Sequence, residues 1–256
     1  MASTSQIEWT QMTWNPVRGC TRVSEGCRNC YAERLATRFA GEGQAYAGLS
    51  VMTVSGPRWT NQVKLVPEIL DQPLRWRKPR VIFVNSMSDL FHPDVPLEFI
   101  QRVFSVMARC PQHTFQILTK RSERLRELAP DLKWPQNVWM GVSVEDAHVV
   151  HRIADLQTVP AVVRFLSVEP LIGPIDELPL NNIQWVIVGG ESGPGARPIE
   201  REWVTSIYQQ CRAADVAFFF KQWGGKRKSL TGRELNGQTY NEMPRPVLEL
   251  NTLVAA

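Results

Sequence analysis

The chain has 256 residues, 43% of them hydrophobic, so it can bury a sizeable core and is not intrinsically disordered. Its 29 basic and 25 acidic side chains give a net charge of +4, a mild excess that permits a nucleic-acid partner without requiring one. No apolar run is long enough to span a membrane and the first residues lack a signal-peptide pattern, so we expect a cytoplasmic protein without membrane association.

A short extended segment at 12–17 leads into three of the five cysteines, Cys20, Cys27 and Cys30. Clustered cysteines in a reducing compartment favour metal ligation over a disulfide framework. Structural zinc normally takes four ligands, whereas an iron–sulfur cluster on three cysteines leaves one iron open. We therefore expect an iron centre, and a zinc site completed by a histidine remains an alternative. A helix over roughly 28–40 should follow.

Beyond residue 60, short apolar runs alternate with amphipathic ones, such as the helical pattern over 97–107. This alternation predicts a parallel sheet covered by helices. The candidate strands are 12–17, 62–66, 80–84, 114–118, 137–142, 162–166, 185–188 and 216–220. Eight units favour a closed α/β fold, a parallel (β/α)8 barrel of the TIM type, over an open doubly wound sheet. We expect one domain over 1–256, with a basic loop and tail from about 224 to 256.

Polar residues follow nearly every candidate strand, at the ends that carry the working residues of parallel α/β folds. Alongside the three cysteines, the candidate metal ligands are Asp89, His92, Glu145 and Glu191. The candidate catalytic residues are Lys120, Glu169 and Lys221. The candidate cofactor-binding residues are Asn85, Ser88, Ser143, Gly189, Gly190 and Ser192. Salt bridges from Lys120 and Lys221 to the glutamates are the alternative to metal ligation.

Basic residues and a tryptophan near these ends could contact phosphates and stack on a base. The candidate nucleic-acid-binding residues are Arg121, Arg197, Trp223, Lys226, Arg227 and Lys228. Their ordinary explanations are a solvated loop for 226–228 and core packing for Trp223.

The motif Cys27-x-x-Cys30-Tyr31-Ala32 resembles the radical S-adenosylmethionine superfamily, above all its spore photoproduct lyase branch, in which C-x3-C-x2-C precedes Tyr-Ala. The whole chain is also similar to a three-Cys-motif family of phages and bacteria with unknown function, described as phage Gp37/Gp68-like. The matching stretches are W-N-P-x-x-G-C at 14–20, N-S-M-S-D-L-F-H at 85–92, L-T-K-R at 118–121, S-V-E-P-L at 167–171, V-G-G-E-S-G at 188–193 and F-K-Q-W-G at 220–224.

The superfamily resemblance implies a [4Fe–4S] cluster on the three cysteines, with S-adenosylmethionine on the open iron and a 5′-deoxyadenosyl radical from its reductive cleavage. It also implies a lyase or repair enzyme acting on DNA, and the family resemblance implies a separate three-Cys-motif partner protein. The sequence departs from the pattern twice. The first cysteine spacing is six rather than three, and the Gly-Gly-Glu turn, which that superfamily places after an early strand, comes at 189–191.

Two other functions therefore remain open. One is an enzyme whose iron cluster, of an iron–oxo or another type with cysteine, carboxylate and histidine ligands, works without S-adenosylmethionine. The other is a zinc-stabilised nucleic-acid-binding module that uses the basic loop.

Overall fold

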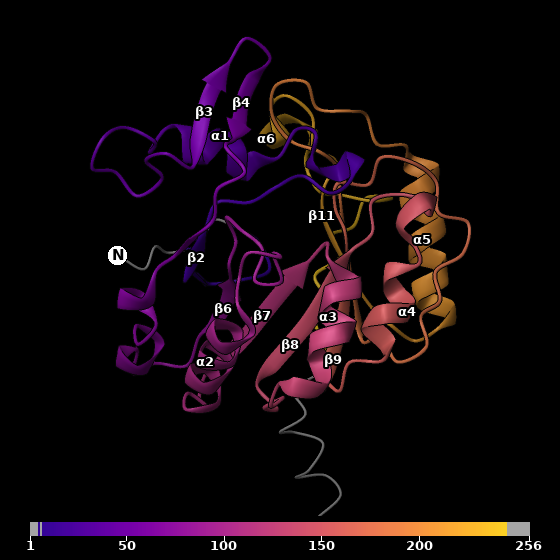
Figure 1. The fold of residues 1–256 in the computed structure, drawn as a ribbon. Coiled ribbons are helices and arrows are strands. Elements are labelled where there is room, and N and C mark those ends of the chain that lie inside the picture. The colour runs from indigo at the N-terminus through magenta and orange to yellow at the C-terminus, as the bar shows by residue number, and fades with distance from the viewer. Residues whose placement is uncertain (1–4, 6, 245–256) are drawn as a thin grey trace, which may run out of the picture.

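The computed structural model describes residues 5 and 7–244, and its centre is a curved sheet of seven parallel strands (Figure 1). They lie in the order β1-β6-β7-β8-β9-β10-β11, so neighbours in the sheet follow one another along the chain. Their bounds are Met12–Trp14, Val81–Val84, Thr114–Thr119, Val138–Ser143, Val163–Val168, Trp185–Gly189 and Ala217–Gln222. Seven of the eight predicted strands are confirmed, because continuous apolar runs suit strands that are buried on both faces.

The eighth predicted strand, 62–66, was wrongly assigned to this sheet. Its residues Lys64–Leu65 form β5, which pairs antiparallel with β2 (Val17–Arg18) in a separate two-stranded sheet. The run differs from the others in its exposed Lys64 and in the proline that follows it, Pro67, which has no N–H to extend a ladder. Another two-stranded sheet is the hairpin of β3 (Ser50–Thr53) and β4 (Gly56–Trp59).

The closed eightfold barrel is not confirmed. A closed barrel gives every strand two neighbours, but within the described residues β1 and β11 are the two edges of the sheet. The free edge of β11 is covered by the chain near 240–242: the N–H of Phe220 donates to the carbonyl of Tyr240 at 3.0 Å. Such cover protects an open edge from pairing with another chain. The expected basic tail lies outside the described residues beyond 244.

Helices α2 to α5 pack on the outer face of the sheet. The helix bounds are Tyr31–Thr37 (α1), Leu97–Ala108 (α2), Ser122–Leu128 (α3), Arg152–Gln157 (α4), Arg201–Ala213 (α5) and Lys228–Thr231 (α6). Single 3-10 turns span Glu25–Cys27 (η1), Pro67–Ile69 (η2), Pro73–Arg75 (η3), Ala129–Asp131 (η4) and Ala147–Val149 (η5). The helix predicted for 28–40 is confirmed but is shorter. It begins after Cys30 and ends at Thr37. Within the described range, no helix combines the length and apolarity needed to cross a bilayer.

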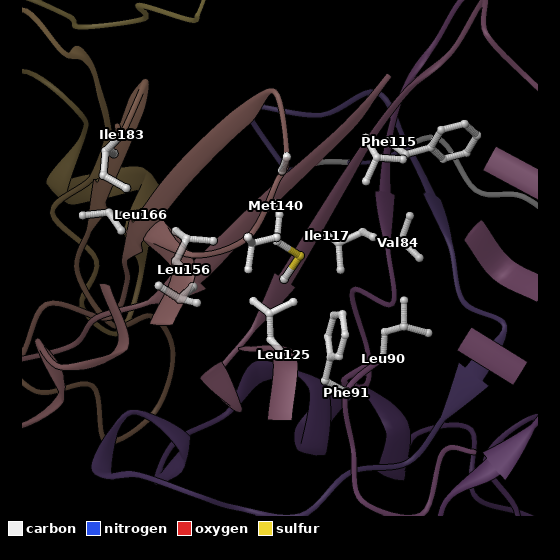
Figure 2. Close-up of a cluster of buried hydrophobic side chains, with 14 of the residues drawn as sticks. Val84, Leu90, Phe91, Phe115, Ile117, Leu125, Met140, Leu156, Leu166 and Ile183 are labelled. Atoms are coloured by element: carbon white, nitrogen blue, oxygen red, sulfur yellow. The ribbon is translucent and has the colours of Figure 1, made fainter. Parts of the chain in front are cut away.

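The outer core forms because alternate side chains of each strand meet the apolar faces of the helices. In α2, Ile100, Val103 and Phe104 are buried at the three- and four-residue spacing of one helix face. Figure 2 shows the same arrangement nearer the middle of the sheet, where Ile117 and Met140 of neighbouring strands lie above Leu125 of α3. Each such side chain contributes about 1.5–3 kcal/mol through its removal from water.

The inner face of the sheet changes from apolar to polar along the strands, and the site lies at the polar end. Trp139 and Gly141 of β8 are followed on the same face by Ser143, and this serine is in register with Ser167 of β9. The aromatic residues of the first part form a second core of their own, in which Trp185 packs against Phe165 at 5.6 Å between ring centroids. The inner face is therefore closed by aromatic rings at its amino end and is polar at its carboxyl end.

Candidate functional site

The three cysteines lie on one loop at the carboxyl ends of the sheet strands. The loop starts at Gly19, whose φ of +83° favours glycine and where a Cβ would lie 2.2 Å from the carbonyl oxygen of Gln62. It continues through η1 and ends at Cys30, directly before α1. All three cysteines are half-buried and line one cavity of about 710 Å³. The structure therefore brings the three predicted thiols to a common space.

Burial affects two of these thiols strongly. It raises the pKa of Cys20 to about 12, with the Asp89 carboxylate acting in the same direction, and it also raises the pKa of Cys30. A metal would have to displace the protons of these two thiols. Within the described part of the chain, no three Cys, His, Asp or Glu side chains are close enough to hold a single metal ion. Three thiols that line one cavity are the donor set of an iron–sulfur cluster, in which each thiolate would bind a different iron atom.

Asp89 is tied to the cysteine loop through an arginine. Its carboxylate accepts from Thr119 Oγ1 at 2.8 Å and pairs with Arg121 Nη1 at 2.8 Å. The same guanidinium donates to both the carbonyl and the hydroxyl of Thr21, and it lies 3.9 Å from Cys20 Sγ. Arg121 therefore joins the end of β7, Asp89 and the first cysteine.

Glu145 contacts the middle of the cysteine loop, between Cys20 and Cys27. It is 1% exposed and pairs with Lys120 at 2.6 Å and Arg152 at 2.9 Å. Ser24 Oγ donates to Glu145 Oε1 at 3.0 Å, and a Cβ on Gly26 would lie 2.4 Å from the same carboxylate. Burial acts to raise the pKa of Glu145, but Lys120 and Arg152 outweigh it, so the pKa is lowered. Glu145 does not line the cavity.

Glu191 holds the end of the loop. It pairs with Arg197 at 2.6 Å and accepts from Asn29 Nδ2 at 2.8 Å. Arg197 also donates to the carbonyl of Glu25 at 2.9 Å. Burial acts to raise the pKa of Glu191, but the hydrogen bonds from Arg197 and Asn29 outweigh it and lower the pKa. Asp89, Glu145 and Glu191 thus each hold a different part of the cysteine loop through hydrogen bonds and ion pairs.

These contacts bear on the predicted metal ligands. Asp89 and Glu191 line the cavity with the cysteines, whereas Glu145 and His92 do not. His92 Nε2 shares a hydrogen bond with Thr21 Oγ1 at 2.9 Å, and burial lowers the pKa of its imidazole. Each of the three carboxylates with a predicted ligand role is already held in an ion pair. That role stays a prediction, whereas the salt bridges considered as the alternative are present.

The cavity floor, the name we give to Trp9, Asn85, Glu169, Lys221 and Gln222, contains a charged pair and three unpartnered polar atoms. Lys221 Nζ lies 2.6 Å from Glu169 Oε1, and both side chains are mostly buried. Among the described residues, seven buried side-chain nitrogen or oxygen atoms have no hydrogen-bond partner, and three of them, Asn85 Nδ2, Gln222 Oε1 and Trp9 Nε1, belong to residues that line the cavity. Buried polar atoms normally find partners, so these three leave hydrogen-bonding capacity beside the cavity that a polar ligand could use.

Most predicted cofactor-binding residues line the cavity: Asn85, Ser88, Ser143, Gly190 and Ser192. Gly189 does not, but a Cβ there would touch Glu169 and Lys221 at 3.4 Å. The catalytic candidates Lys120, Glu169 and Lys221 all line it. Sequence reasoning missed Gln222, Ser167 and Trp9, although the first two also end strands and could have been found by the same rule.

The predicted nucleic-acid-binding residues are more dispersed. Arg121 and Lys228 line the cavity. Arg197 does not line it and is paired with Glu191. Lys226 and Arg227 are exposed and also lie outside the cavity lining. Trp223 packs against Phe220 at 4.7 Å between ring centroids, and its Nε1 donates to the carbonyl of Glu234 at 2.9 Å. Their contact with nucleic acid stays a prediction.

Comparison with known proteins identifies the family. Residues 4–244 match the family described as "Protein of unknown function (DUF5131)", and the chain belongs to it. The phage Gp37/Gp68 name is not among these findings. No curated protein sequence matches the chain.

Among solved structures, the fold is similar to a spore photoproduct lyase mutant with bound AdoMet and dinucleoside spore photoproduct, at a TM-score of 0.50 and 11% identity over 82% of this chain. A second spore photoproduct lyase mutant is similar at a TM-score of 0.49 and 12% identity, again over 82% of this chain. The chain spans 63% of the length of each of these proteins. At such identity the likeness establishes the fold alone.

Proposed function

We propose that this member of the DUF5131 family is an iron–sulfur enzyme that uses S-adenosylmethionine and acts on nucleic acid. Cys20, Cys27 and Cys30 would hold one [4Fe–4S] cluster. The observation that carries the proposal is their position on one loop over one cavity, at the carboxyl ends of parallel strands. In the bound state the cluster would supply the electron that cleaves S-adenosylmethionine reductively. The likeness of the fold to a lyase with bound AdoMet supports this choice.

The cavity floor suits the cofactor. S-adenosylmethionine carries amino, carboxylate, ribose and adenine groups, and each needs a polar partner in a buried site. Asn85 Nδ2 and Trp9 Nε1 are free to donate, and Gln222 Oε1 is free to accept. The paired Lys221 and Glu169 carry one positive and one negative charge at the same floor, so they can orient a zwitterionic amino-acid group.

The arginine at Cys20 also fits this function. Arg121 places a positive charge 3.9 Å from the Cys20 sulfur, where thiolates would carry negative charge. It favours the deprotonated thiol, which is the form that binds metal. For the substrate, the net positive charge and the dinucleoside spore photoproduct bound in the similar lyase structure support nucleic acid. The repair or modification of a damaged base is the reaction class we assign.

S-adenosylmethionine cleavage under reducing conditions tests the proposal. Protein purified and reconstituted without air would be incubated with dithionite and S-adenosylmethionine, and 5′-deoxyadenosine would be quantified. We expect its formation by the unchanged chain and by Cys110→Ala, since Cys110 lies in the outer core. Cys20→Ala, Cys27→Ala and Cys30→Ala should form none.

Two results would contradict the proposal. Iron-loaded protein that leaves S-adenosylmethionine intact would favour the enzyme with an S-adenosylmethionine-independent iron cluster. Colourless protein containing zinc would favour the binding module.

A further inference from the structure

The net charge of the protein is concentrated in one segment, residues 18–64, which we call the cap. The cap contains the cysteine loop, α1 and the β3–β4 hairpin, and Figure 1 shows the hairpin projecting beside α1 at one end of the molecule. It holds seven basic residues, Arg18, Arg22, Arg28, Arg34, Arg38, Arg58 and Lys64, and three acidic ones, Glu25, Glu33 and Glu42. Its net charge of +4 equals that of the whole chain, so the remainder is neutral.

Much of this charge is not neutralised locally. Arg22 pairs with the buried Glu33. In contrast, within the described residues no carboxylate lies within ion-pairing distance of Arg28, Arg38 or Arg58. Arg28 and Arg38 are exposed, and the absence of a paired carboxylate leaves them available to an anionic partner. A polyanion is the occupant that this surface would attract most strongly.

The cap also exposes apolar side chains beside this charge. Tyr31, Leu35 and Phe39 follow one another at four-residue spacing from the start of α1, they line the cavity, and Tyr31 and Phe39 are 48% and 47% exposed. On the hairpin, Met52 is 64% exposed and Val54, at the turn, is fully exposed. Large side chains of this kind are normally buried, and the three that line the cavity together mark an interaction surface.

We propose that the cap binds single-stranded or unstacked nucleic acid and guides one base toward the cavity. Exposed aromatic rings next to unpaired arginines are the combination used for single strands, in which bases stack on rings and cations contact phosphates. Tyr31 and Phe39 would stack on bases, while Arg28 and Arg38 would contact phosphates. Because a duplex keeps its bases stacked, these rings would favour a single strand over a duplex. The proposal rests on the proposed function only for the chemical class of the substrate.

Binding of a fluorescently labelled oligothymidine tests the cap directly. Anisotropy would be measured with iron-loaded protein at about 50 and 200 mM salt, where phosphate contacts make affinity fall steeply. Phe39→Ala should weaken binding roughly tenfold, the effect typical of removing one stacked base. Arg28→Ala/Arg38→Ala should weaken binding and reduce the log–log salt slope by roughly 0.7 for each phosphate that an arginine no longer neutralises.

Three controls keep the result interpretable. Arg102→Ala/Arg109→Ala removes the same charge from exposed positions on and just beyond α2, and we expect unchanged binding. Lys226→Ala/Arg227→Ala compares the cap with the basic loop, and the loop variant should show the smaller decrease in affinity. A labelled duplex of the same length should bind more weakly than the single strand.

The proposal is overturned if the cap variants bind like the unchanged protein, if the α2 variant is weakened as much as the cap variant, or if duplex binds as tightly as single strand. Its failure is distinguishable from failure of the proposed function. If only the cap proposal is wrong, the protein cleaves S-adenosylmethionine but the cap variants bind nucleic acid like the unchanged protein. If only the enzyme proposal is wrong, the protein does not cleave S-adenosylmethionine but its binding to nucleic acid still depends on salt and on the cap. Absence of any salt-dependent binding would also overturn the cap proposal and would favour a protein as the occupant of this surface.

Discussion

The guanidinium of Arg121 lies 3.9 Å from the sulfur of Cys20 and at the same time 2.8 Å from the carboxylate of Asp89. The side chain is 8% exposed, so this contact links a proposed cluster ligand to a buried carboxylate. The same principle recurs along the cysteine loop, where Glu145 supports Ser24 and Glu191 accepts from Asn29. The strand-end carboxylates therefore hold the loop that carries the thiols.

Replacing Arg121 should loosen the first cysteine. Arg121→Gln removes one partner of a buried ion pair, a change that costs about 3–5 kcal/mol in stability, and it frees Thr21 and Cys20 from β7. We expect less iron per folded molecule after reconstitution and a changed visible spectrum. Arg109→Gln, at an exposed site just after α2, should change neither iron content nor the urea midpoint. Full iron retention by Arg121→Gln would show that the contact does not position the cysteine.

The stability of the protein should depend on Glu145 in a pH-dependent manner. Its pKa is lower in the folded than in the unfolded protein, so its contribution is complete above the unfolded value of about 4.3 and is lost as the pH falls further. Glu145→Gln should therefore destabilise the protein by about 3 kcal/mol or more near neutrality. In urea unfolding the difference from the unchanged protein should shrink below about pH 4. A difference that grows on acidification would contradict the assignment.

Gly26 should tolerate no side chain. A Cβ would lie 2.4 Å from Glu145, and that carboxylate cannot move aside easily because Lys120 and Arg152 hold it. Gly26→Ala should displace the loop and lower iron content while the apoprotein stays folded by circular dichroism. Gly173→Ala, whose Cβ would make an ordinary 3.4 Å contact, is the matched control. Equal iron in both variants would refute the close fit of loop and carboxylate.

The aromatic inner core should depend on Gly141 in a similar way. A Cβ there would lie 2.5 Å from the Phe165 ring, which is fully buried. Gly141→Ala should destabilise the protein by about 1–3 kcal/mol through overpacking. Phe165→Leu vacates part of that space. The double variant should therefore lose less unfolding free energy than the two single variants lose together, by a coupling of about 0.5–3 kcal/mol. Simple additivity of the two changes would show that the residues do not compete for space.

The parallel sheet could be predicted because its strands are continuous apolar runs that need no distant information. The run at 62–66 looked similar, but its pairing depended on the position of β2, which lies far away in the sequence. Closure of the barrel likewise depends on how β1 and β11 are placed, and no local pattern encodes that. Sequence periodicity identifies strands better than it identifies their neighbours.

The site was predictable to a similar extent. The thiols and the strand-end position of Asp89, Glu169 and Glu191 followed from spacing and topology, and these residues do line one cavity. The partners of the carboxylates did not follow, because Arg152 and Arg197 are recruited from a helix and a loop that carry no motif. The exposed row from Tyr31 to Phe39 was also missed, since helical spacing alone does not tell an outward apolar face from a buried one.

A cluster held by the cysteine loop is tested most directly by the iron content and visible spectrum of protein purified without air, with each cysteine of the loop changed in turn. We expect iron with broad visible absorption in the unchanged chain and in Cys211→Ala, whose cysteine lies in the outer core. We expect loss of both iron and absorption in Cys20→Ala, Cys27→Ala and Cys30→Ala. A loop variant that keeps the unchanged iron content and spectrum would contradict a cluster held by all three thiols.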